Sequence, residues 1–157
     1  MVRVSRNMKT FLLALCALTA WAFAEPGRKE RTLAGKDALL RDGSGRIAAT
    51  ASTSGSNTTF RDGSGRITGT AQVSTNGTQT FRDGSGRLTG TGAASGNNTT
   101  YRDGSGRISC TASTSTTGTT TYRDGSGRIT GTSSVSGDTI TYRDGSGRIT
   151  GTARVSK

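Results

Sequence analysis

Residues 78–91 read Thr-Gln-Thr-Phe-Arg-Asp-Gly-Ser-Gly-Arg-Leu-Thr-Gly-Thr, and this stretch contains the features that decide the fold. Its central phrase, Arg-Asp-Gly-Ser-Gly-Arg followed by Ile or Leu, occurs six times in the chain. The aspartates of the phrase are separated by 20 or 21 residues, which is a period typical of repeat architectures. They are Asp42, Asp62, Asp83, Asp103, Asp124 and Asp144.

The sequence of each repeat predicts a β-hairpin. The β-branched and aromatic residues before the phrase favour a strand, and the Thr-containing stretch after it favours a second strand. Between them, Asp-Gly-Ser-Gly supplies a turn, because glycine accepts a positive φ and aspartate caps its own turn. Further turn residues, such as Thr75-Asn76-Gly77, separate one unit from the next. We therefore predict an all-β fold, a tandem array of about six 20–21-residue hairpins that forms a curved single sheet or a β-solenoid-like stack.

Side chains alternate across a strand, and this predicts two faces for the sheet. Ile67 and the alternate residues that follow it are expected on a weakly apolar face, with threonine and arginine on the other face. If the turn has four residues, Phe81 lies opposite Leu88, which is a favourable pair. The two arginines that flank the turn would then also face each other, which is repulsive unless the turn aspartate or a bound anion bridges them.

The N-terminus has the layout of a secretory signal peptide. Basic residues between Arg3 and Lys9 precede a short apolar run, and Ala22-Phe23-Ala24 forms a small-x-small cleavage site. The apolar run is too short to cross a membrane. We expect the protein to be secreted, periplasmic or located at the cell surface. The predicted division is 1–24 signal peptide, 25–39 flexible linker and 40–157 β-hairpin repeat domain.

One unit carries a pattern that is found in a known family. It reads Tyr101-Arg102-Asp103-Gly104-Ser105-Gly106-Arg107-Ile108, and threonine-rich sequence follows. This combination of Tyr, Asp and Gly-Arg-Ile resembles the YD (Rhs-type) repeats of bacterial surface proteins. The resemblance covers most of residues 40–157, but arginine replaces the Tyr that directly precedes the Asp in that family. It implies a β-hairpin array at a cell surface, and it does not imply a toxin shell, because six repeats are too few to enclose a cargo.

The repeats lack the residues of common catalytic sites. The chain contains no histidine, and each motif aspartate stands between arginines that lower its basicity. The same arginines oppose a bound cation, and each repeat supplies only one carboxylate. We therefore expect that the protein is not an enzyme and that it needs neither a metal nor another cofactor.

The arginines are the remaining candidates for function. The chain has 21 Lys and Arg against 10 Asp and Glu, a net charge of +11. Backbone N–H groups of Gly-Ser-Gly-Arg could also form a small nest for an anion. We predict that the six motif aspartates are turn-forming. The candidate anion-binding residues are Arg41, Arg46, Arg61, Arg66, Arg82, Arg87, Arg102, Arg107, Arg123, Arg128, Arg143 and Arg148.

These observations favour an exported, non-enzymatic structural or adhesive protein of the cell surface, envelope or extracellular matrix. Interchangeable polar strands favour edge-to-edge pairing, so we expect that the protein associates with itself as a homo-oligomer or filament. The alternative function is a module that binds an anionic polymer, a polysaccharide or a nucleic acid, through the repeated arginine ladder. A minor alternative is ice binding by Thr-x-Thr units such as Thr68-Gly69-Thr70, although the flanking arginines would disturb an ordered water layer.

Two further features leave alternatives open. Cys110 occupies a position that is glycine in most other repeats, which favours a drifted position over an intermolecular disulfide or an attachment thiol. Four asparagines begin Asn-x-Thr sequons that would be glycosylated in a eukaryotic secretory pathway, and turn preference explains them equally well. They are Asn57, Asn76, Asn97 and Asn98.

Overall fold

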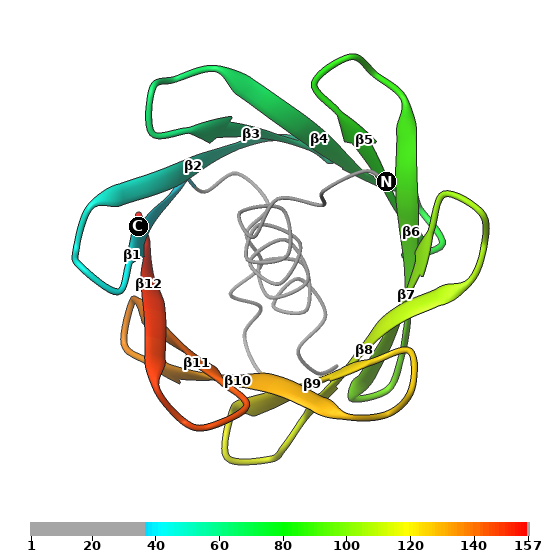
Figure 1. Cartoon of the computed structure of the whole chain (residues 1–157). Helices are drawn as coiled ribbons and strands as arrows, with labels where there is room; N and C mark the ends of the chain where they lie inside the picture. Colours follow the sequence, from blue (N-terminus) through cyan, green and yellow to red (C-terminus); the bar gives the residue numbers. More distant parts are fainter. Residues whose placement is uncertain (1–36, 157) are drawn as a thin grey trace, which may run out of the picture.

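The computed structural model describes residues 37–156 as a closed barrel of twelve antiparallel strands (Figure 1). Each strand pairs with its neighbours in the sequence, and β1 closes the barrel against β12. Every repeat forms one hairpin, so the predicted all-β fold of repeated hairpins is confirmed. The strands are β1 Ala38–Asp42, β2 Ile47–Ser54, β3 Asn57–Asp62, β4 Ile67–Val73, β5 Gln79–Asp83, β6 Leu88–Ser95, β7 Asn98–Asp103, β8 Ile108–Thr114, β9 Thr119–Asp124, β10 Ile129–Ser136, β11 Thr139–Asp144 and β12 Ile149–Val155.

The predicted curved single sheet or β-solenoid-like stack is wrong, because the sheet closes on itself. Each hairpin meets the next with the same twist and stagger, and these offsets accumulate until the first strand meets the last. Closure pairs both edges of the sheet, which an open array would leave exposed. The first strand begins at Ala38, so it includes residues that we assigned to the linker.

Part of the sequence prediction falls outside the described residues. The predicted signal peptide, 1–24, and nearly all of the predicted linker lie there, as does Lys157. Within 37–156, no helix is long and apolar enough to span a membrane.

The hydrophobic core consists of the side chains on the inward face of the barrel. The odd-numbered strands of the first five repeats each contribute one large buried apolar side chain, β11 of the sixth repeat contributes Ile140, and Tyr142 of that strand packs against the same cluster. Each large side chain lies opposite a small residue of the next strand; for example, Phe60 pairs with Gly69 and Phe81 with Gly90. The aromatic ring thus covers the backbone that the small residue leaves open. The buried large apolar side chains are Leu40, Phe60, Phe81, Tyr101, Tyr122, Ile140 and Val155.

A β-bulge follows every motif turn and changes the faces that we predicted. Phe81 pairs with Gly90, and Arg82 pairs with Leu88, so Thr89 is the extra residue in β6. The expected pairing of Phe81 with Leu88, and of the two flanking arginines with each other, is therefore wrong. The extra residue shifts the phase of the strand by one, which places the aliphatic residue on the outer wall.

This shift also corrects the expected position of Ile67. The residue was predicted on the apolar face with Gly69, but its side chain is 42% exposed, whereas Gly69 is buried. Beside it, the Thr68 hydroxyl donates a hydrogen bond to the Phe60 carbonyl at 3.3 Å, which stabilises the bulge. The equivalent residue is exposed in all six repeats. These outward aliphatic residues are Ile47, Ile67, Leu88, Ile108, Ile129 and Ile149.

Candidate functional site

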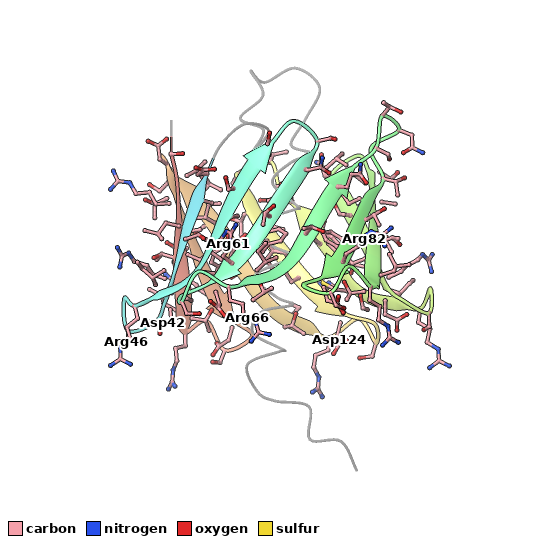
Figure 2. All side chains as sticks on the ribbon, turned by 90° about the horizontal axis from the view of Figure 1, so that it is seen from above. Asp42, Arg46, Arg61, Arg66, Arg82 and Asp124 are labelled. Carbon is pink, nitrogen blue, oxygen red and sulfur yellow. The ribbon has the colours of Figure 1, made fainter. Side chains whose placement is uncertain are left out.

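The turns of the barrel are divided between its two ends. The six Asp-Gly-Ser-Gly turns join each odd-numbered strand to the next even-numbered strand, so they lie together at one end, which we call the motif rim. Figure 2 shows Asp42, Arg46, Arg66 and Asp124 at this end. Five turns of other sequence lie at the opposite end, together with Asp37 and Ser156, and we call this end the variable rim. The motif rim turns occupy 42–46, 62–66, 83–87, 103–107, 124–128 and 144–148.

Aspartate closes each turn of the motif rim. Asp83 Oδ1 accepts hydrogen bonds from the Ser85 N–H at 2.9 Å, the Ser85 hydroxyl at 2.6 Å and the Arg87 N–H at 3.0 Å. The same three hydrogen bonds recur in the other five turns. The serine hydroxyl is the largest cause that lowers the pKa of each aspartate, and the backbone N–H groups add to it. A carboxylate held in this way is a poor proton acceptor, which suits a turn and not a general base.

The two glycines of the phrase have different roles. Gly86 has φ +87°, the left-handed conformation that completes a type I turn with a G1 bulge. Gly84 has no such φ, but a Cβ atom there would lie 2.7 Å from the Ile67 carbonyl oxygen of the preceding hairpin. The first glycine therefore allows neighbouring hairpins to approach each other, and the second allows the chain to turn.

The two arginines of the phrase are also not equivalent. The first, such as Arg82, donates from Nη1 to the Gly86 carbonyl at 3.0 Å and so braces the turn. Its five counterparts make the same hydrogen bond. We call these the bracing arginines. They are Arg41, Arg61, Arg82, Arg102, Arg123 and Arg143.

The second arginine forms hydrogen bonds in the turn only through its backbone, and its positive charge adds the smallest contribution to the lowered pKa of the turn aspartate. The Arg87 N–H binds Asp83, but its guanidinium forms no hydrogen bond or salt bridge with any residue in 37–156. All six residues at this position are exposed, and Figure 2 shows Arg46 and Arg66 pointing away from the barrel. We call them the rim arginines. They are Arg46, Arg66, Arg87, Arg107, Arg128 and Arg148.

The structure thus brings all twelve candidate anion-binding arginines to one end of the molecule. They form a ring and not the straight ladder that an open array would give, because the hairpins close into a barrel. Sequence reasoning missed the outward aliphatic residues beside them; Ile67, for example, pairs with Arg61 on the outer wall. We predicted the two faces from the alternation of side chains along a regular strand. That alternation does not indicate where a bulge interrupts the strand, so it could not show that these residues are exposed.

The other candidate features lie away from this rim. Cys110 is buried opposite Tyr101, in the place where other repeats have glycine. The four sequon asparagines are exposed and lie toward the variable rim. Thr68 and Thr70 of the Thr-x-Thr unit lie in β4, in the wall of the barrel, and both are half-buried. Residues 37–156 contain no group of three or more His, Cys, Asp or Glu side chains that could hold a metal ion.

Comparison with known proteins assigns no family to the chain. No family model matches it, and none of the curated proteins matches it. Among solved structures, the crystal structure of BamB from Moraxella catarrhalis is similar over 68% of this chain and 40% of that chain, with 10% sequence identity and a TM-score of 0.23. The chain therefore spans well under half the length of that protein, and the TM-score is too low to show a common fold.

Proposed function

We propose that the protein is an exported, non-enzymatic adhesive protein that binds an anionic polymer through its rim arginines. The observation that carries this proposal is that the guanidinium groups of the rim arginines form no hydrogen bond or salt bridge with any described residue. Every other polar part of the motif is used by the fold: the aspartate accepts the turn hydrogen bonds, the serine donates to it, and the bracing arginine holds the loop.

The chemistry of the rim arginines suits repeated negative charges. A guanidinium is permanently charged and forms paired hydrogen bonds with phosphate, sulfate or carboxylate groups. Six such groups on one ring engage several charges of one polymer at the same time, so each weak contact raises the effective concentration for the next. Binding of this kind falls steeply with salt, because the polymer's counterions are released.

An acidic polysaccharide fits the rim better than a single-stranded nucleic acid does. Proteins that bind single strands stack bases on exposed aromatic side chains. Phe60, Phe81, Tyr101 and Tyr122 are all buried in the barrel, so they offer no such platform. The outer wall next to the rim is formed by threonine, arginine and aliphatic residues instead.

The test is salt-gradient elution of the purified protein from immobilised heparin, which is a sulfated polysaccharide. Replacement of all six rim arginines by glutamine should abolish the salt-dependent retention. Arg154→Gln, which removes an exposed arginine of the variable rim, should change the elution little. Circular dichroism of each variant establishes that the barrel is intact. Elution of the six-fold variant at the wild-type salt concentration would rule out the proposal.

A further inference from the structure

The seam between β1 and β12 is a sixth copy of the junction that joins successive hairpins. In each junction the motif aspartate of one hairpin pairs with the same position of the preceding hairpin: Asp83 with Gly69, and Asp103 with Gly90. At the seam, Asp42 of the first hairpin pairs with Gly151 of the last in this same register. The barrel therefore closes by a contact that the chain makes five more times along its sequence.

The close packing at the seam is also that of the other junctions. A Cβ atom at Gly151 would lie 2.5 Å from the Arg41 carbonyl oxygen. The equivalent distance between Gly131 and the Arg143 carbonyl oxygen is 2.4 Å. The seam has no turn between its two strands, whereas a short turn at the variable rim connects the strands of every other junction.

We propose that the seam is a self-recognition surface whose partner is a second copy of this chain. The terminal hairpin, β1 and β2, leaves its own barrel by extension of the turn at Gly55 and Ser56. It then fills the equivalent place in the second copy, where β1 pairs with the partner's β12 in the register seen here. The exchange is mutual, so both barrels keep twelve strands, and outside the opened turn every backbone hydrogen bond between strands is replaced by an identical one.

The balance between the two forms depends on protein concentration. Within one chain, the terminal hairpin is tethered near its own seam, so its effective concentration there is high and the closed monomer is favoured at low protein concentration. When unfolded chains refold together at high concentration, the equivalent site on a second copy competes, since the register does not distinguish the two. This inference is independent of the arginine rim and holds whether or not the rim binds a polymer.

Two disulfide variants test the seam directly. Leu39→Cys with Arg154→Cys links the outward pair at the seam, and Ala93→Cys with Thr100→Cys links the equivalent pair at the β6–β7 junction. Both are made with Cys16→Ala and Cys110→Ala, so that neither native thiol of the chain competes. Each protein is oxidised while folded and dilute, unfolded in urea, refolded at high concentration, and analysed by size-exclusion chromatography with light scattering.

The expected result is a dimer from the unmodified protein and from the β6–β7 variant, with loss of the dimer in the seam variant and its return on reduction. Two results would overturn the proposal. Refolded wild-type protein that stays monomeric at every concentration would show that the seam does not recognise a second copy. An equal dimer in the oxidised seam variant would show that the copies associate through another surface. Heparin elution of the monomer reports on the proposed function separately.

Discussion

The motif rim and the variable rim are built by the same twelve strands, yet only the motif rim repeats its sequence. At the motif rim, all six turns have Asp-Gly-Ser-Gly and the same set of hydrogen bonds. At the variable rim, the turn between β2 and β3 contains Gly55-Ser56, and the longer turn between β4 and β5 contains Ser74-Thr75-Asn76-Gly77-Thr78. Both kinds of turn connect antiparallel strands, so the formation of a hairpin does not explain the difference.

The surroundings of the glycines explain it. A Cβ atom on the variable-rim turn glycines Gly55, Gly96, Gly118 and Gly137 would meet nothing within 4 Å. At the motif rim, the first glycine of each turn lies against a carbonyl oxygen of the preceding hairpin. Each motif turn is therefore part of a junction between hairpins, and its sequence is constrained on two sides. The variable-rim turns are constrained only by the strands that they connect.

The largest effect is expected from a side chain placed in this junction. Gly125→Ala puts a Cβ atom 2.5 Å from the Ile108 carbonyl oxygen, so the two hairpins must move apart, which costs about 3 kcal/mol of unfolding free energy. Gly127 and Gly118 both have a positive φ in open space, so alanine at either position costs only about 1 kcal/mol of backbone strain. Urea unfolding of the three variants measures this order. A loss at Gly125 no greater than that at Gly118 would contradict the two-sided constraint.

The sequence predicts the hairpins well because they depend on local chemistry. The positions of Asp83, Gly84 and Gly86 within each period specify the turn, and the turn specifies which two strands pair. Closure of the barrel could not be predicted in this way, since it depends on a small offset that every junction repeats. The contact of Gly84 with the preceding hairpin, which sets that junction, lies between residues that are distant in the sequence.

The sequence identifies the residues of the candidate site but does not predict how they are arranged. All twelve arginines were named from their repetition, and the structure divides them into two classes that the sequence does not distinguish. The division follows from the loop: the Gly86 carbonyl accepts a hydrogen bond from Arg82 Nη1, whereas the Arg87 guanidinium forms no hydrogen bond with a described residue. The predicted faces of the strand were also wrong. The bulge at Thr89 places Leu88 on the outer wall, where its side chain is exposed.

The next largest effect is expected from the turn acceptors. Asp83→Ala leaves three donors of the motif rim without their acceptor, and we expect it to lower the unfolding free energy more than the loss of an acceptor at the variable rim does. Asn76→Ala at the variable rim removes an acceptor of two hydrogen bonds, from the Ser74 hydroxyl and the Thr78 N–H, and should cost about 1 kcal/mol. Thermal unfolding of both variants, with Asp83→Asn as the isosteric control, measures the difference. Equal losses would show that the two rims are stabilised to the same degree by their acceptors.

Acid should loosen the motif rim and leave the variable rim turn unaffected. The pKa of Asp83 is lowered from 3.8 in the folded protein, so its contribution to stability is complete above that value and is lost as the pH falls through the lower, folded pKa. Asn76 does not titrate. In an NMR titration from pH 6 to pH 2, the Ser85 N–H resonance should move with a midpoint below 3.8, and the Thr78 N–H resonance should stay in place. Ser85→Ala removes the largest cause of the shift and should raise the midpoint, whereas an unchanged midpoint would assign the shift to another group.

The smallest effects separate the two classes of arginine. Arg82→Gln removes the hydrogen bond from Nη1 to the Gly86 carbonyl at an exposed site, so we expect a loss of about 0.5–1 kcal/mol of unfolding free energy. Arg87→Gln keeps the backbone N–H that binds Asp83 and removes a guanidinium that forms no hydrogen bond or salt bridge with a described residue, so its stability should stay within about 0.5 kcal/mol of wild type. Urea unfolding at two salt concentrations distinguishes a hydrogen bond from general charge repulsion, because salt screens only the second strongly. If Arg87→Gln destabilises the barrel as much as Arg82→Gln does, the rim arginines belong to the fold, and the reason to assign them a binding role is lost.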